Sequence, residues 1–192
     1  VGMSVDIMAT IARKTRYVSG LPLQSGKAGG DPSPKTAYGI LCGIQAAVKT
    51  RLSRDDLQGV RVAVQGVGHV GYHVCRLLHA AGATLLASDL DETRVDRVCA
   101  EFGAERVSSA EILFADVDVL APCALGNILT STTIPKIRAK VVAGGANNQL
   151  STPEDGARLA EHDILYAPNY VINAGGIISV EAEYFGNSSE DD

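Results

Sequence analysis

Residues 61–91 contain, in order, the parts of a turn that binds a dinucleotide. A β-branched stretch, residues 61–65, leads into Gly66-Val67-Gly68-His69-Val70-Gly71, and a helical pattern follows. A second apolar stretch, residues 84–88, ends at Asp89. In such a unit the three glycines permit a tight turn, close approach of the backbone to a pyrophosphate, and close packing of helix on strand. Because strand, turn, helix and acid occur together, the segment predicts a dinucleotide site rather than an ordinary turn.

The same segment predicts which groups would face the ligand. The first helical turn, with His69 and Val70, offers unpaired N–H groups and a partial positive charge to phosphates. Asp89 would accept hydrogen bonds from the hydroxyls of the adenosine ribose. Its charge would repel a 2′-phosphate, so NAD is expected rather than NADP, although Arg94 nearby would weaken that preference. For His69, a surface position on the helix is the alternative to a catalytic role.

Composition excludes several classes of partner. Hydrophobic residues make up 46% of the 192 residues and charged residues 20%, which is enough apolar material for a buried core. The net charge of −5 leaves no basic surplus to neutralise phosphates, so neither nucleic acid nor an anionic membrane is an expected partner. The sequence has no apolar run of membrane-spanning length and no signal peptide, and a cytoplasmic location is expected.

The cysteines give no sign of a disulfide framework or a metal site. Cys42, Cys75, Cys99 and Cys123 are widely spaced and form no C-x-x-C pair. The G-x-S-x-G, H-E-x-x-H and Walker A signatures of hydrolases, metalloproteases and kinases do not occur either.

The rest of the chain alternates between short apolar strands and helical patterns. Strands are expected at residues 60–65, 84–88, around Val107, 117–121, 140–143 and 164–166. Helices are expected at residues 1–19, 35–50, 69–81, 93–102, 109–114, around Ile134, 153–161 and 175–184. This alternation predicts an α/β fold of the Rossmann type: a doubly wound, mostly parallel sheet with helices on both faces and flanking helices at both ends.

Three further segments would follow strands at the carboxyl edge of the sheet, where ligands of such folds bind. After residues 117–121 come small residues, including Cys123 and Ala124, that would let the adenine-ribose half lie close to the backbone. After residues 140–143 comes the sequence Gly144-Gly145-Ala146-Asn147-Asn148-Gln149. It suits hydrogen bonding to the nicotinamide or its ribose, and a polar turn is the alternative. Asn173 follows the last strand and would either face the substrate or cap the final helix.

Five ordered motifs resemble the amino-acid dehydrogenase superfamily of glutamate, leucine, phenylalanine and valine dehydrogenases. They are GGDPSPKTAYG at 29–39, QGVGHVGYH at 65–73, APCALGNIL at 121–129, GGANNQL at 144–150 and APNYVINAGGII at 167–178. The likeness is greatest to the leucine, phenylalanine and valine dehydrogenases. It implies NAD-dependent oxidative deamination of a branched-chain or aromatic L-amino acid to the 2-oxo acid and ammonia, by a homo-oligomeric enzyme.

The resemblance also implies roles for particular residues. Glycines of the turn would hold the pyrophosphate, and Asp89 the adenosine ribose. Thr36 and Asn148 would contact the nicotinamide end, and Asn173 the substrate near the reacting carbon. The full expected cofactor set is Thr36, Gly66, Gly68, His69, Val70, Gly71, Asp89, Cys123, Ala124, Ala146 and Asn148.

One part of the family pattern is missing from the sequence. The family's substrate-activating lysines lie in a GGGKA-type motif of an N-terminal domain; no such motif occurs, and Lys27, in SGKAGG, lies on the cofactor side. The family's catalytic aspartate precedes V-G-[TM], so it would come just before Val1. We therefore expect no catalytic residue in this chain. Residues 1–59 would form hinge helices and a loop, 60–166 the nucleotide-binding core, and 167–192 a helix and tail, without the substrate domain.

Two other hypotheses fit the sequence. In the first, the chain is a free-standing NAD-binding or regulatory module without turnover. In the second, it is a dehydrogenase with self-contained chemistry that uses His69 or Lys27. The choice among leucine, valine and phenylalanine as substrate stays open.

Overall fold

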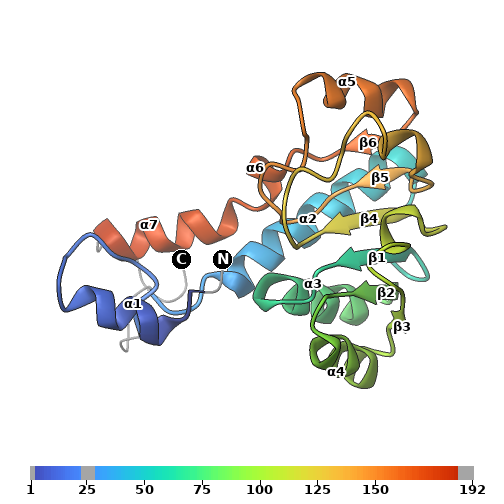
Figure 1. Cartoon of the computed structure of the whole chain (residues 1–192). Coiled ribbons are helices and arrows are strands. Elements are labelled where there is room, and N and C mark those ends of the chain that lie inside the picture. The colour runs from blue at the N-terminus through green and yellow to red at the C-terminus, as the bar shows by residue number, and fades with distance from the viewer. Residues whose placement is uncertain (1–2, 23–28, 186–192) are drawn as a thin grey trace.

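A single parallel sheet organises the chain. The computed structural model describes residues 3–22 and 29–185. Six strands lie in the order β3-β2-β1-β4-β5-β6, and all neighbours are parallel (Figure 1). Their bounds are β1 Arg61–Gln65, β2 Thr84–Ser88, β3 Glu105–Arg106, β4 Val119–Pro122, β5 Val141–Val142 and β6 Leu165–Tyr166. Strand order runs outward from β1 in both directions, so the prediction of a doubly wound Rossmann-type sheet is confirmed.

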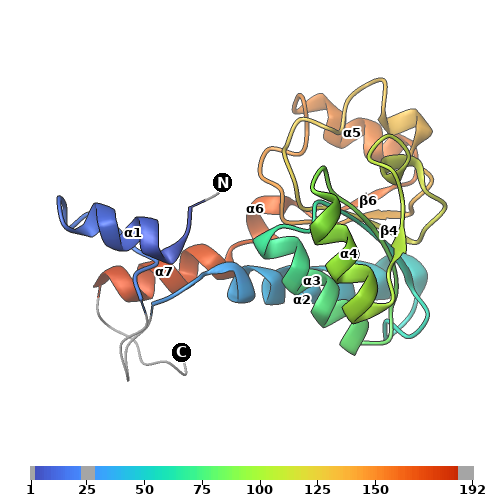
Figure 2. The same cartoon turned by 60° about the horizontal axis from the view of Figure 1, so that its bottom comes forward.

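Helices cover both faces of this sheet. One face carries α2 (Ser33–Leu52), α3 (His69–Ala80) and α4 (Glu92–Phe102), while the other carries α5 (Glu154–Glu161) and two 3₁₀ turns, η1 (Ile112–Phe114) and η2 (Ile134–Lys136) (Figure 2). Side chains alternate along each strand, so Val62 and Val64 enter one apolar cluster and Ala63 the other. Strands covered on both faces should be apolar throughout, and β4 is buried at every position.

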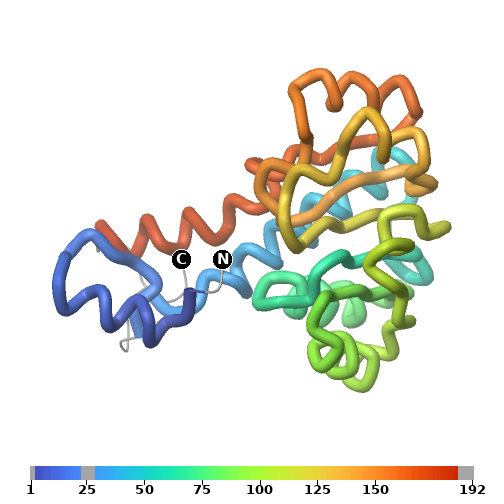
Figure 3. The backbone as a smooth tube through the Cα atoms, viewed as in Figure 1, coloured from blue at the N-terminus to red at the C-terminus, as the bar shows by residue number. Residues whose placement is uncertain are grey.

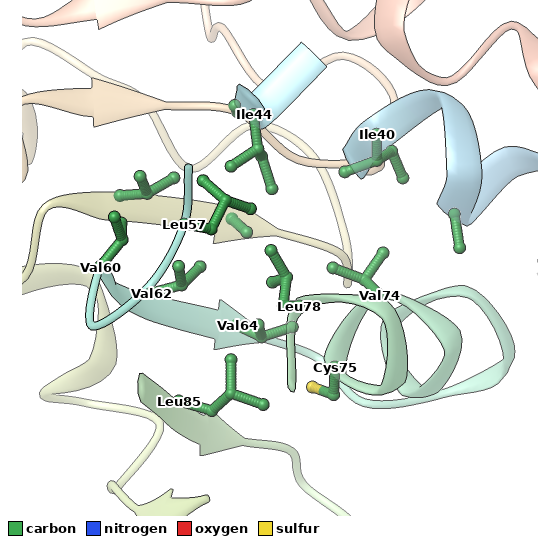
Figure 4. Close-up of a cluster of buried hydrophobic side chains, with 14 of the residues drawn as sticks. Ile40, Ile44, Leu57, Val60, Val62, Val64, Val74, Cys75, Leu78 and Leu85 are labelled. Carbon is green, nitrogen blue, oxygen red and sulfur yellow. The ribbon is translucent and has the colours of Figure 1, made fainter. Parts of the chain in front are cut away.

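The larger cluster lies between β1 and the pair α2 and α3. Figure 4 shows Ile40 and Ile44 of α2, Val74 and Leu78 of α3, and Val64 of β1 converging in it. Each of these five side chains lies 20 residues or more in sequence from a partner on another element, so the cluster forms only when α2 has packed against β1 and α3. The helix α2 is therefore part of the same core as the strands.

Two helices lie to one side of the sheet (Figure 1). They are α1 (Val5–Ala12) and α7 (Gly175–Phe185), and the short helix α6 (Asn169–Ile172) leads into α7. A Cβ on Gly175 would overlap the Lys35 carbonyl oxygen, so glycine lets α7 approach the start of α2. Glu183 of α7 accepts hydrogen bonds from the N–H groups of Gly20 (2.6 Å) and Leu21 (2.9 Å). The segment after α1 consequently lies beside α7 (Figure 3).

Several predicted elements were wrong in extent. The helix expected over residues 1–19 begins at Val5, after the Ser4 cap, and ends at Ala12. No residue of α1 is buried, so tertiary packing does not extend it beyond two turns. The helices expected at 109–114 and around Ile134 are single 3₁₀ turns, and the strand expected around Val107 lies at residues 105–106. The helix α6 was not predicted.

Among the described residues, no helix combines the length and the apolar character needed to span a membrane.

The core makes a direct stability prediction. Ile44 is fully buried on α2, and Ile44→Ala should lower the free energy of unfolding by about 2–5 kcal/mol through lost burial and a residual cavity. Ile177→Ala removes the same atoms from the exposed face of α7 and should cost about 0.5 kcal/mol or less. Urea unfolding monitored by circular dichroism measures both, and equal losses would contradict the assignment of α2 to the core.

His73 is the half-buried histidine of α3. Its Nδ1 atom is buried and has no hydrogen-bond partner in the described part of the chain. Burial lowers the pKa of His73 from its usual value, and the neighbouring Arg76 lowers it further, whereas Asp31 acts in the opposite direction. The folded chain therefore binds this proton less readily than the unfolded chain does.

That difference gives His73 a predictable effect on stability. Its contribution is present above the unfolded pKa of about 6.5 and is lost as the pH falls below it, because only the unfolded state then gains the proton readily. His73→Gln should therefore flatten the fall in unfolding free energy between pH 7.5 and pH 5. His162→Gln, at an exposed position after α5, is the matched control. An unchanged slope in His73→Gln would refute the prediction.

Candidate cofactor-binding site

The glycine turn lies between β1 and α3, at the carboxyl edge where strand order reverses. Gly66 has φ +88°, a conformation that L side chains rarely adopt. A Cβ on Gly71 would overlap the Gly66 carbonyl oxygen, and a Cβ on Gly66 would lie 2.6 Å from that of Ala124. Two of the three predicted glycines are thus required by close backbone packing.

Gly68 differs from the other two because its open side faces a cavity. The nearest atom to a Cβ placed there is Arg94 Nη1 at 3.3 Å. The cavity has a volume of about 340 Å³ and is lined by Val67, Gly68, His69, Tyr72, His73, Arg94 and Arg97. The first turn of α3, whose N–H groups lack partners within the helix, begins at its wall. Open space beside Gly68 and a helix N-terminus together fit a pyrophosphate group.

Asp89 holds the glycine turn against the next loop. Its Oδ2 accepts a hydrogen bond from the Val67 N–H (2.8 Å), and its Oδ1 accepts one from the Asp91 N–H (3.0 Å). The side chain is half-buried at the end of β2. Because each carboxylate oxygen has a second lone pair, Asp89 keeps the capacity to accept bonds from ribose hydroxyls.

Both arginines of the cavity pair with carboxylates. Arg94 Nε lies 3.1 Å from Asp91 Oδ2, and Arg97 Nε lies 2.9 Å from Glu101 Oε1. Arg97 also lies over the Tyr72 ring, whose hydroxyl donates to Glu101. The Tyr72 hydrogen bond, and then Arg97, hold the pKa of Glu101 below its usual value. The positive charge beside the turn is therefore already balanced.

A second group of loops meets on the other side of the turn, after β4 and β5. Gln149 is fully buried, and its Nε2 donates to the carbonyls of Gly144 (2.7 Å) and Ala146 (2.9 Å). The Ala146 N–H in turn donates to the Pro122 carbonyl at 2.8 Å. A Cβ on Gly126 would overlap the Asn147 carbonyl oxygen, so the two loops touch. These bonds join the carboxyl ends of β4 and β5.

Asn173 is brought to the same place from the far end of the chain. Its Nδ2 donates to Asn147 Oδ1 (2.8 Å) and to the Gly145 carbonyl (3.2 Å). It immediately follows α6, and its amide binds the β5 loop instead of capping α7. The structure thus joins two predicted motifs, GGANNQL and APNYVINAGG, through one side chain.

The remaining predicted residues are placed as follows. Thr36 donates to its own helix at the Pro32 carbonyl (3.0 Å) and packs against Gly176. His69 is exposed at the start of α3, and Val70 Cγ1 would lie 3.3 Å from a Cβ on Gly145. Asn148 is exposed with φ +52°. Lys27 lies outside the described residues.

Sequence reasoning missed the supporting residues of both groups. The sequence motifs assign no role to Gln149, Tyr72 or Gly126. One feature of the sequence pointed to the burial of Gln149. The apolar Leu150 directly follows it, and an apolar residue at that place is unusual in an exposed turn.

Two cysteines lie near the glycine turn, and burial affects the pKa of both thiols. Burial raises the pKa of Cys123 to about 11, and a hydrogen bond from the Gly145 backbone acts the other way. Burial also raises the pKa of Cys75 on α3. Within residues 3–22 and 29–185, no three His, Cys, Asp or Glu side chains group together as metal ligands would.

A sequence model of the Glutamate/Leucine/Phenylalanine/Valine dehydrogenase family matches residues 31–93 and 88–191 of this chain. The leucine dehydrogenase of Geobacillus stearothermophilus is 47% identical over 190 residues, covering 99% of the chain and 52% of that enzyme. The phenylalanine dehydrogenase of Lysinibacillus sphaericus is 37% identical over 194 residues, covering 98% and 51%.

A solved structure, that of L-tryptophan dehydrogenase from Nostoc punctiforme, superposes with a TM-score of 0.81 at 44% identity, covering 97% of this chain and 52% of that one. The chain spans about half the length of the curated relatives it matches. The match of the family model over most of the chain decides its membership. The chain belongs to the glutamate/leucine/phenylalanine/valine dehydrogenase family.

Proposed function

We propose that this chain is the cofactor-binding domain of an NAD-dependent L-amino-acid dehydrogenase, which converts a branched-chain or aromatic amino acid to its 2-oxo acid and ammonia. The proposal rests above all on one observation: the glycine turn and the Asn173 junction lie at the same edge of the sheet, on either side of the switch between β1 and β4. Relatives named for leucine, tryptophan and phenylalanine support the substrate class.

The two ends of the cofactor would bind to residues on different halves of the sheet. Gly68, His69 and Val70, at the start of α3, would hold the pyrophosphate, and Asp89 the adenosine ribose. Gly66 and Gly71 would keep the turn closed. On the β4–β5 side, the cofactor would lie against Cys123, Ala124, Ala146, Asn148 and Thr36. The negative charge of Asp89 at the end of β2 supports NAD over NADP, because it would repel a 2′-phosphate, and Arg94 and Arg97 each already pair with a carboxylate through Nε.

When bound, NAD supplies the acceptor for the hydride that leaves the α-carbon of the amino acid. The chain's own contribution is placement. Asn173 would orient the substrate, and its bonds to Asn147 and Gly145 would keep it at a fixed distance from the cofactor loop. The lysine and aspartate that handle protons would come from an N-terminal domain, as the family resemblance implies, so the isolated chain is expected to be inactive.

Exposed apolar side chains support contact with further protein. On α1 they are Ile7 and Ile11, and on α7 they are Ile177 and Ile178. Grouped apolar exposure of this kind is characteristic of contact surfaces. We propose that they face the substrate domain or other subunits of a homo-oligomer.

Calorimetry on this chain tests the cofactor assignment. The chain should bind NAD, and NADP at least about tenfold more weakly because of charge repulsion at Asp89. Asp89→Asn should weaken NAD binding by about tenfold and narrow the ratio between the two cofactors. Asp116→Asn, at an exposed position before β4, is the control. NADP binding as tight as NAD binding by the unmodified chain would overturn the assignment.

An activity assay tests the reaction. The product of the longest reading frame containing this chain should reduce NAD with at least one of leucine, valine, phenylalanine and tryptophan, whereas the isolated chain should not. NAD binding without turnover by either protein would favour a binding module. Turnover by the isolated chain that disappears in His69→Ala would instead show self-contained chemistry.

A further inference from the structure

The fully buried amide of Gln149 is the most unusual polar group near the proposed site. Its side chain is 0% exposed, and its Oε1 has no hydrogen-bond partner within the described residues. Burying an amide costs free energy unless its polar atoms are paired, so methionine, of similar length, would fill this space at a lower desolvation cost. What methionine cannot do is donate hydrogen bonds in fixed directions.

Both donors of Gln149 act on one loop. Nε2 binds the carbonyls of Gly144 and Ala146, which are two residues apart just after β5. In a trans peptide the N–H of the next residue points opposite to the carbonyl. The two bonds therefore direct the N–H groups of Gly145 and Asn147 away from Gln149.

The two N–H groups reach different surroundings. The Gly145 N–H lies beside the Cys123 thiol, whose pKa it lowers against the larger effect of burial. Asn147 is exposed, and its N–H makes no hydrogen bond to another residue of the described chain. The Asn147 side chain is fixed by Asn173, whose Nδ2 donates to its Oδ1. The loop consequently presents an oriented donor, free for a ligand, on the β4–β5 half of the carboxyl edge.

We propose that Gln149 is a positioning residue for the nicotinamide half of the cofactor: it aims the Asn147 N–H at an acceptor of the nicotinamide riboside portion. The inference rests on the cofactor site proposed above and assigns the β5 loop a specific donor. On the β4 side, Pro122 accepts a hydrogen bond from the Ala146 N–H and Gly126 packs against the Asn147 carbonyl, so the same loop is held from a second direction.

The test compares NAD with ADP, which lacks the nicotinamide riboside. Calorimetry on the unmodified chain should show binding of both, with NAD bound more tightly. Gln149→Met should weaken NAD binding about tenfold, as expected for loss of an oriented hydrogen bond, and change ADP binding less than about twofold. Gln45→Met, at an exposed position on α2, should change neither.

A second measurement needs no variant. In a ¹⁵N–¹H spectrum of the unmodified chain, the Asn147 amide signal should shift on addition of NAD and stay in place with ADP. Three results would overturn the inference while leaving the cofactor site intact. They are an equal weakening of NAD and ADP binding in Gln149→Met, unchanged NAD binding in that variant, and an Asn147 signal that does not shift when NAD is added. Failure of the unmodified chain to bind either ligand would instead remove the proposed function, and the inference with it.

Discussion

The close approach of Gly71 to the Gly66 carbonyl is the contact on which the rest of the structure depends. It lets α3 begin directly after β1, so the helix lies flat along the sheet and buries Val74 and Leu78 against Val64. Once α3 is seated, α2 packs against it through Ile40 and Ile44. A side chain at residue 71 would push helix and strand apart, and the loss would spread from the turn to the main core.

A second constraint acts at the carboxyl edge, where loops from distant parts of the sequence share their hydrogen bonds. Pro122 and Asn173 each lie more than 20 residues from the β5 loop in sequence, yet both are hydrogen-bonded to it, at Ala146 and Gly145 respectively. The loop residues are polar, and hydrogen bonds fix the orientation of most of their polar groups. Regular strands supply the rigid support, and side-chain amides set the fine geometry.

Local sequence predicted the glycine turn well because each of its requirements is encoded within a few residues. Strand alternation likewise predicted the parallel sheet and its two-sided cover. The helix over residues 1–19 was wrong because its apolar stripe of Val5, Met8 and Ala12 finds too little to pack against, a tertiary fact that periodicity does not contain. The cofactor and substrate roles of individual residues stay predictions.

The sequence did not predict the hydrogen-bond partners of three polar side chains. In the sequence, Gln149 and Glu183 are ordinary polar residues of a turn and a helix, and the role predicted for Asn173 does not include its bonds to the β5 loop. Glu183 and Asn173 bond to partners up to 163 residues away, and Gln149 bonds to carbonyls of its own loop, which its full burial in the fold makes possible.

The bonds of Glu183 carry a mechanical consequence. The helix α2, 20 residues long and so about 30 Å, runs from the core of the sheet out to the side where α1 and α7 lie. There Glu183 of α7, near the C-terminal end of the sequence, is hydrogen-bonded to Gly20 and Leu21, near the N-terminal end. The Gly20–Leu21 segment cannot move away from α7 without breaking both bonds at once, while the Gly175–Lys35 contact joins the other end of α7 to the start of α2.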